Sequence, residues 1–348
     1  MNQRGGAERV FAQIAHTFPD APIYTSMVDL DVTGDLFPGR TIHTSFLQHM
    51  PARRRLFRWY AHLYPRAFEA FDLREYDVVV SSSSAWAKGV RTRADAVHVS
   101  YLHAVSRFVF DYDAYIGGFG VGTLARPIIN RLVAWDEQAA QRPTRLLANS
   151  QNVADDIAKY YRRSATVVHP PVDLQRFTPT DNRSDYFFIA SRLLPYKRID
   201  RAIAAAKAAD VRLVIVGTGP SLAALREQAH GSKVELLGFV DDATVVALMR
   251  EARAVILPGS EDFGLVPIEA AACGRPTIAL ARGGAMTTVI PDVTGAHFST
   301  QEELTEILRA FDVTRFSPER IRAHALEFGN DAFRRRIREC VEETVVLR

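Results

Sequence analysis

Short apolar runs alternate with helical stretches along the second half of this chain, and this alternation is the strongest constraint on its fold. The expected strands are residues 186–191, 211–217, 234–238, 254–258 and 276–280. Helical patterns at 199–209 and 220–229 separate the first three of them. Strands alternating with helices are typical of a parallel sheet with helices on both faces. The second half therefore predicts a doubly wound α/β domain.

The first half has the same organisation in a less regular form. Short apolar runs predict strands at 23–24, 78–80, 96–99 and 146–148. Longer periodic stretches predict helices at 7–16, 56–71 and 125–141. Residues 167–185 then break the pattern with two adjacent prolines and a polar tail, which indicates a crossing between domains. A length of 348 residues also favours two domains. We expect two Rossmann-like doubly wound domains, over residues 1–172 and 173–330.

Composition narrows the classes of protein that fit this chain. The net charge is only +3, from 43 basic and 40 acidic residues, which is too small for a dedicated nucleic-acid binder. Two cysteines, Cys273 and Cys340, favour a reduced, cytoplasmic setting. No apolar run approaches about 18 residues, so no transmembrane helix is expected. The start of the chain, MNQRGGAERV, also lacks the apolar stretch of a signal peptide.

The sequence EDFGLVPIE at 261–269 is the most informative local motif. It places Glu261 in a loop and Glu269 eight positions later, in what we expect to be the first turn of a helix. The backbone N–H groups of Phe263, Gly264 and Leu265 would surround the positive end of that helix dipole. This geometry suits a diphosphate on the dipole, a sugar at the loop and a ribose on the inner carboxylate.

Further candidates follow the other predicted strands of the second half. Arg192 and Lys197 come after the first strand and could bind one diphosphate; the alternative is a solvated basic turn. Gly217 begins a Gly-x-Gly turn after the second strand, which fits a tight turn as well as a phosphate loop. After the third strand, Phe239 and Val240 could contact a nucleobase, although a phenylalanine here is more often part of the core.

Two candidates lie in the first half. Gly5 and Gly6 precede a helix with Glu8 in its first turn, and such a pair allows backbone to approach a phosphate. His103 follows a predicted strand, four residues before Arg107. It could hydrogen-bond a sugar hydroxyl or act as an acid or base, and the alternative is a partly buried structural histidine.

Other patterns carry less weight. Asp29-Leu30-Asp31 and Asp111-Tyr112-Asp113 match the Asp-x-Asp pattern of metal–diphosphate sites, but both lie away from the phosphate elements, so no metal is expected. The serines at 81–84 lack the glycine flanks of a hydrolase nucleophile elbow.

Residues 49–65 combine arginines with aromatic side chains. At helical spacing they would form a basic, aromatic face suited to anionic lipid headgroups; an ordinary amphipathic helix is the equal alternative. The arginines concerned are Arg53, Arg54, Arg55 and Arg58.

Taken together, these motifs resemble the retaining glycosyltransferases of family 4, which have the GT-B fold and include bacterial GDP-mannose-dependent mannosyltransferases. The matching stretches are GGAER, YDVVVSSSSAWAKG, YLHAVSRF, LLANSQNVADDI, HPPVDLQRF, SRLLPYKRID, LLGFV, EDFGLVPIEAAACGRPTIAL and GGAMTTV. The resemblance implies two domains facing a cleft, with acceptor bound by the first and nucleotide sugar by the second. It also implies that residues 331–348 form a helix packed back on the first domain.

The resemblance implies a role for each matching residue. Arg192 and Lys197 would neutralise the leaving diphosphate, Glu261 would contact the donor sugar and Glu269 the ribose. His103 would hydrogen-bond the transferred sugar. Gly5 and Gly6 would face the diphosphate from the other domain. The donor would be GDP-mannose or a UDP-sugar, the acceptor a lipid-linked or polysaccharide glycan, and no metal or other cofactor would be required.

Two departures from the family pattern bear on function. Only MNQR precedes Gly5-Gly6, where relatives have a strand that lies inside the first sheet, and its absence would remove central ladder hydrogen bonds. Thr287 stands where relatives usually have glutamate. Thr287 weakens one supporting contact only. The missing strand indicates either that the start of the sequence is placed too far downstream, or that the first domain is altered, and in the second case a catalytically impaired nucleotide-sugar-binding protein is the alternative to an active transferase. A nicotinamide-dependent oxidoreductase is disfavoured because GTGPSL lacks the third glycine of a dinucleotide fingerprint.

Overall fold

The structure is a computed structural model that describes residues 1, 5–57, 59–106 and 126–348. It folds into two compact units: residues 1–170 with 333–348 form unit 1, and residues 171–332 form unit 2. Both units are built on parallel strands with helices packed against them, so the predicted α/β class with two doubly wound domains is confirmed.

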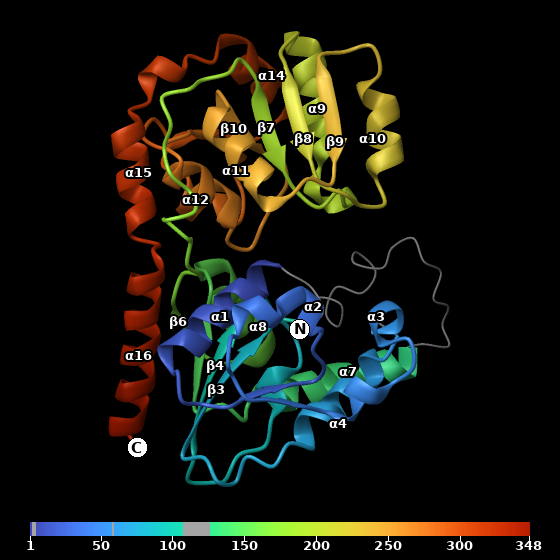
Figure 1. The fold of residues 1–348 in the computed structure, drawn as a ribbon, viewed down its shortest axis with the longest axis vertical. Coiled ribbons are helices and arrows are strands. Elements are labelled where there is room, and N and C mark those ends of the chain that lie inside the picture. Colours follow the sequence, from blue (N-terminus) through green and yellow to red (C-terminus); the bar gives the residue numbers. More distant parts are fainter. Residues whose placement is uncertain (2–4, 58, 107–125) are drawn as a thin grey trace. The chain divides into compact units, whose positions relative to one another are not determined.

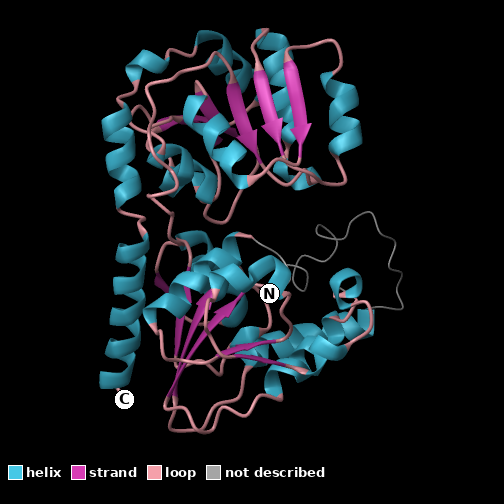
Figure 2. Ribbon diagram, viewed as in Figure 1, coloured by secondary structure: helices cyan, strands magenta, loops and turns pink. Residues whose placement is uncertain are grey.

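Unit 2 contains one six-stranded parallel sheet, drawn as magenta arrows flanked by helices in Figure 2. Its strands are β7 (Phe187–Ala190), β8 (Leu213–Val216), β9 (Val234–Gly238), β10 (Ala254–Leu257), β11 (Thr277–Leu280) and β12 (Gly295–Phe298). Its helices are η6 (Pro195–Lys197), α9 (Ile199–Ala209), α10 (Leu222–Ala229), α11 (Asp242–Glu251), α12 (Leu265–Ala272), α13 (Ala285–Thr288), α14 (Gln301–Ala310), η7 (Val313–Arg315) and α15 (Pro318–Leu326).

The strand order in unit 2 is β12-β11-β10-β7-β8-β9. Figure 1 labels the four strands from β10 to β9. The chain therefore runs outward in one direction from β7 to β9, returns, and runs in the other direction from β10 to β12. Right-handed crossovers then place helices on both faces of the sheet. The order reverses between β7 and β10, and open α/β sheets bind ligands beyond the carboxyl ends of the strands at such a reversal.

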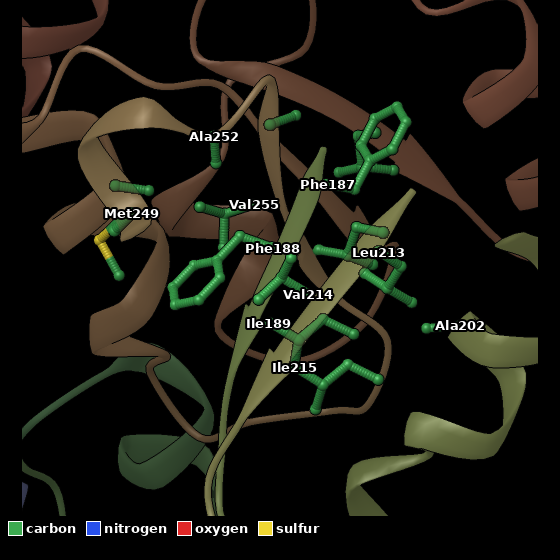
Figure 3. Close-up of a cluster of buried hydrophobic side chains, with 14 of the residues drawn as sticks. Phe187, Phe188, Ile189, Ala202, Leu213, Val214, Ile215, Met249, Ala252 and Val255 are labelled. Carbon is green, nitrogen blue, oxygen red and sulfur yellow. The ribbon is translucent and has the colours of Figure 1, made fainter. Parts of the chain in front are cut away.

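A large hydrophobic core holds unit 2 together, and Figure 3 shows part of it. Phe188 and Ile215 on neighbouring strands are at most 1% exposed, and Met249 of α11 is fully buried against the same core. In α9 the buried side chain of Ala202 is small, which allows the helix backbone to approach the sheet closely. The sheet ends that carry the candidate site are therefore fixed on a well-packed base.

The described part of unit 1 contains two separate parallel sheets, β1-β2 and β3-β4-β5-β6. The strands are β1 (Ile23–Thr25), β2 (Ile42–Thr44), β3 (Val78–Ser83), β4 (Val97–Leu102), β5 (Arg145–Ala148) and β6 (Thr166–Val167). The helices are α1 (Gly6–Thr17), α2 (Leu30–Thr33), η1 (Gly34–Leu36), η2 (Phe46–His49), α3 (Arg53–Leu56), η3 (Ala61–Leu63), α4 (Tyr64–Glu69), η4 (Ala87–Gly89), α7 (Arg126–Ala139), α8 (Gln151–Tyr161) and α16 (Asn330–Val346).

In the described part of unit 1, β1 and β3 are joined by side chains and share no hydrogen-bonded ladder. Tyr24 of β1 and Val79 of β3 pack against the same aromatic cluster, and the hydroxyls of Tyr24 and Tyr76 lie 3.0 Å apart. The buried residues of this unit accordingly form several small clusters, whereas those of unit 2 form one large core and one small cluster. We infer that unit 1 is held more by local side-chain packing than by one continuous sheet.

The last helix, α16, completes the core of unit 1. Its buried residues Phe333 and Ile337 pack with Val99 and Tyr101 of β4, and the rings of Phe333 and Tyr101 meet edge to face at 5.7 Å. Arg145 at the start of β5 donates a hydrogen bond of 2.8 Å to Glu343 of the same helix.

A buried polar network links η4, α7 and α8 in unit 1. The ammonium of Lys88 lies 2.5 Å from Asp136 Oδ1, and both side chains are at most 1% exposed. Asp136 also accepts hydrogen bonds from Ser106 at 2.7 Å and from the Tyr161 hydroxyl at 2.6 Å. Burial lowers the pKa of Lys88, which the neighbouring carboxylate opposes. The Asp136 carboxylate thus offsets the buried positive charge of Lys88, and its own oxygens are satisfied by the ammonium and the two hydroxyls.

His98 of β4 makes the stability of unit 1 sensitive to acid. Its Nε2 lies 2.8 Å from Ser81 Oγ, and burial, together with the charges of Arg142 and Arg163, lowers its pKa to about 3. The folded state therefore keeps His98 neutral while the unfolded chain takes up a proton below pH about 6.5. Stability from this residue is complete above that pH and is lost as pH falls toward 3.

We predict that His98→Gln flattens the pH dependence of unfolding. Between pH 6 and 4 the wild type should lose about 1.4 kcal/mol per pH unit more than the variant, because the variant lacks the titrating ring. Urea unfolding followed by tryptophan fluorescence at stepped pH measures this slope. Equal slopes in the two proteins would contradict the assignment, whatever the absolute stability of the variant.

Residues 56–71 do not form the single helix that their spacing predicts. The chain instead makes the short segments α3, η3 and α4, and Ala52 just before α3 has a left-handed backbone with φ of 48°. The predicted continuous basic, aromatic helix face over 49–65 is therefore wrong. Arg58 lies outside the described residues. By contrast, α1 and α7 correspond closely to the helices expected at 7–16 and 125–141.

Candidate active site

Lys197 and Glu261 form an ion pair at the point where the strand order of unit 2 reverses. Lys197 ends the short helix η6, which follows β7, and Glu261 lies in the loop after β10. Their side chains are only 12% and 25% exposed, and the Lys197 ammonium also lies 5.1 Å from the centre of the Tyr196 ring. The two motifs that the sequence placed in separate loops are thus in direct contact.

Three glycines allow the loops around Glu261 to pack this closely. A Cβ on Gly259 would lie 2.7 Å from the Lys197 carbonyl oxygen, and one on Gly284 would lie 2.1 Å from that of Phe263. Gly283 has a left-handed φ of 68° and forms an isolated parallel bridge with Glu261. In addition, the Gly284 N–H donates to the Glu261 carbonyl at 2.8 Å. The loop at Gly283 and Gly284 therefore holds the backbone of Glu261, and Lys197 holds its side chain.

Arg192 lies in an exposed position on the loop after β7. This loop rests on the loop after β8: the Leu193 N–H donates to the Thr218 carbonyl at 2.9 Å. A Cβ on Gly217 would lie 1.8 Å from the Ser191 carbonyl oxygen, so any side chain there would push the Arg192 loop away. This close approach of backbone gives Gly217 a structural reason, and its role in binding phosphate stays a prediction.

Helix α12 begins at Leu265, with Gly264 as its N-cap at a φ of 81°. Its first N–H groups have no partner within the helix and can bind an anion. The Phe263 side chain is buried and packs against Phe328. Glu269 is the fifth helical residue and lies in the second turn, which corrects the expectation that it lies in the first.

Phe239 follows Gly238 at the end of β9 and is 81% exposed. The alternative that it belongs to the core is therefore wrong. Val240 is half-buried and packs against the core of unit 2. An exposed aromatic ring at this sheet end is available to stack on a planar ligand.

In unit 1, Gly5 is the N-cap of α1 and its N–H donates to Glu8 Oε2 at 3.1 Å. Gly6 is the first residue of that helix. His103, just beyond β4, has its Nε2 2.8 Å from Ser82 Oγ, and burial lowers its pKa to about 4. The ring is therefore neutral near pH 7, where it suits hydrogen bonding better than proton donation.

Of the two Asp-x-Asp patterns, the one at Asp29 and Asp31 lies in the described residues and is explained by ion pairs. Arg54 forms ion pairs with both Asp29 and Asp31, at 2.5 Å and 2.6 Å. In the described ranges, no three His, Cys, Asp or Glu side chains gather as a metal site. Asp111, Asp113 and Arg107 lie outside those ranges. Within the same ranges, no helix is both long and apolar enough to cross a bilayer.

Two family models match this chain. Residues 173–315 match the family described as Glycosyl transferases group 1, and residues 4–176 match Glycosyltransferase Family 4. The class defined by these matches and by the two parallel-sheet units is that of GT-B glycosyltransferases. The chain belongs to glycosyltransferase family 4, which confirms the resemblance at that level.

Curated relatives share part of the sequence. A D-inositol 3-phosphate glycosyltransferase of Mycobacterium sp. (strain KMS) is 34% identical over 187 residues, covering 46% of this chain and 42% of that protein. One from Salinispora arenicola is 35% identical over 211 residues, covering 49% of this chain and 47% of that protein. The chain thus spans less than half the length of these relatives.

Solved structures share the fold over most of the chain. Anabaena Alr3699/HepE in complex with UDP has a TM-score of 0.73 at 19% identity, covering 99% of this chain and 98% of that one. Sucrose-phosphate synthase from Thermosynechococcus elongatus has a TM-score of 0.66 at 18% identity, covering 88% and 84%. At these identities the likeness shows the fold.

Proposed function

We propose that this protein transfers a sugar from a nucleotide-diphosphate donor to a glycan or lipid-linked acceptor, with retention of anomeric configuration. The observation that carries the proposal is the Lys197–Glu261 pair at the strand-order reversal of unit 2. Arg192 lies five residues before Lys197, on an exposed part of the same loop. A cation pair and a carboxylate at such a position suit a sugar diphosphate.

The proposed chemistry follows from where charge develops. As the sugar–phosphate bond breaks, the sugar becomes oxocarbenium-like and negative charge grows on the diphosphate. Lys197, which is held by its ion pair, and the first N–H groups of α12 would stabilise the leaving group, and the Arg192 guanidinium would add a further positive charge. The acceptor hydroxyl then attacks the same face of the sugar and passes its proton to the departing phosphate oxygen.

The remaining candidates have binding roles in this proposal. Glu261 contacts the donor sugar and Glu269 the ribose, while the exposed ring of Phe239 stacks on the base. His103 hydrogen-bonds the transferred sugar as a neutral imidazole. Gly5 and Gly6 offer backbone to the diphosphate.

The resemblance to mannosyltransferases favours GDP-mannose as donor. UDP-sugars are the second choice, since one structural neighbour is described with UDP-glucose. The names of the curated relatives add an inositol phosphate to the acceptors worth testing. The test is nucleotide release from GDP-mannose, UDP-glucose and UDP-GlcNAc, with and without such acceptors. Release dependent on one donor supports the proposal, and donor binding without turnover would support an impaired nucleotide-sugar binder instead.

We also propose peripheral contact with anionic membranes through residues 49–65. Trp59 is 79% exposed and Leu56 39% exposed, beside the arginines of α3. We predict that Arg53→Ala with Arg55→Ala weakens binding to anionic vesicles severalfold, more at low salt than at high salt, because exposed charges are screened. Co-sedimentation with vesicles measures this, and unchanged binding would contradict it.

A further inference from the structure

A cavity of about 520 Å³ in unit 1 is lined by four arginines. It lies at the amino ends of β4 and β5, since its lining includes Ala96, just before β4, and Thr144, just before β5. His103 and Asn149 follow the carboxyl ends of the same two strands. The cavity is therefore at the opposite edge of this sheet from the residues proposed for sugar transfer. Its arginines are Arg91, Arg93, Arg142 and Arg348.

The arginines are held in place and still keep hydrogen-bond donors. Glu69 accepts from Arg91 at 2.9 Å and from Arg142 at 2.6 Å, so one carboxylate fixes two guanidinium groups. Arg348 donates to the carbonyl of Ala94. A guanidinium has five N–H donors, and in the described part of the chain Arg91 and Arg348 each use one of theirs. No Asp or Glu side chain is among the described residues that line the cavity.

Arg93 is the most fully engaged of the four. It donates to Asp77 and Asp95, each at 2.6 Å, and to the carbonyl of Arg74. The neighbouring carboxylates therefore offset part of the positive charge, and the cavity is not an unpaired cationic patch. What distinguishes it is the convergence of several oriented guanidinium forks, which match phosphate geometry better than a single point charge does.

We propose that this cavity binds a small phosphorylated metabolite, at a site separate from the one that binds the nucleotide sugar. A volume of about 520 Å³ lies within the range of small-molecule sites and exceeds what one phosphate group fills. Thr144 adds a hydroxyl group, whose oxygen accepts a hydrogen bond from the backbone N–H of His98 at 3.1 Å. The apolar lining residues Val90 and Ala96 are buried and cannot anchor a bilayer, which favours a soluble ligand over a lipid surface.

Calorimetric titration of the full chain with pyrophosphate tests the proposal. Because pyrophosphate should also bind near Lys197, the titration uses an Arg192→Ala, Lys197→Ala background. One site is expected to remain there, and adding Arg91→Ala or Arg348→Ala should weaken it about tenfold or more, as loss of a charge-assisted hydrogen bond predicts. Arg66→Ala removes the same charge from an exposed position on α4 and should leave binding unchanged.

Two outcomes would overturn the proposal. One is absence of pyrophosphate binding in the background protein, or binding that Arg91→Ala and Arg348→Ala both leave intact. The other is Arg91-dependent binding to vesicles containing phosphoinositide without binding of soluble pyrophosphate, which would assign the site to a lipid headgroup. Glu69 keeps Arg142 and the Trp135 indole as partners after Arg91→Ala, so the variant should fold, and tryptophan fluorescence verifies this.

Discussion

Replacing Lys197 with alanine is expected to lower kcat by about 10²-fold or more, because in the proposed mechanism the ammonium would stabilise charge that appears only as the diphosphate leaves. Glu261→Gln and Arg192→Ala should have effects of similar size. KM for the donor should change less than kcat, since ground-state binding is shared with the backbone at α12 and with neighbouring groups. Initial rates of nucleotide release over a range of donor concentrations separate the two constants.

A charge exchange distinguishes catalysis from simple support of the loop. Lys197→Glu combined with Glu261→Lys can restore an ion pair between the loops, so stability should recover relative to either single change while turnover stays low. Lys207→Ala provides the matched control, as it removes one exposed lysine from the same unit. Near-normal kcat in all three single-site variants, or recovery of kcat in the exchanged protein, would defeat the assignment.

Replacing Lys88 with methionine is expected to destabilise unit 1 by about 3–5 kcal/mol, the range for removing one partner of a buried ion pair. Without the ammonium, the buried Asp136 carboxylate keeps, among the described residues, the hydroxyls of Ser106 and Tyr161 as side-chain hydrogen-bond donors. All three tryptophans of the chain, Trp59, Trp86 and Trp135, belong to unit 1, so their fluorescence reports its unfolding.

The second partner and an exposed lysine complete this experiment. Lys88→Met combined with Asp136→Leu should be more stable than Lys88→Met alone, because no buried charge remains unpaired. Lys233 forms an ion pair with Asp210 at the surface, and Lys233→Met should cost no more than about 1 kcal/mol. A Lys88→Met variant as stable as Lys233→Met would show that the interior pair has no special role.

The sequence was most informative where periodicity was strong and local. The helix expected at 199–209 and the strand expected at 234–238 have those bounds in the structure, because each apolar pattern ends at a turn residue. The prediction of one helix over 56–71 was wrong, because the apolar residues of this stretch belong to the separate short segments α3, η3 and α4. Strands β2 and β6 have three and two residues, too few for any pattern to show.

The candidate site was predictable in its side chains and less so in its backbone. In a doubly wound sheet the first and fourth strands of unit 2, β7 and β10, lie side by side where the strand order reverses. The loops that follow these two strands therefore meet, which brings Lys197 to Glu261. The support from Gly283 and Gly284 was missed, although a glycine pair just after a predicted strand could have signalled close backbone approach. The exposure of Phe239 depends on where β9 ends relative to its neighbours, which local sequence does not encode.

Unit 1 is built from two stretches of the chain that lie before and after unit 2, and this has a consequence for folding during synthesis. Unit 2 is one continuous stretch and can fold while it emerges from the ribosome, because domains generally fold as units during synthesis. The earlier stretch, although translated first, must wait for Phe333 and Ile337 before β4 is covered. Until then the apolar face of Val99 and Tyr101 is open to chaperones and to aggregation, so unit 1 is begun before unit 2 and completed after it.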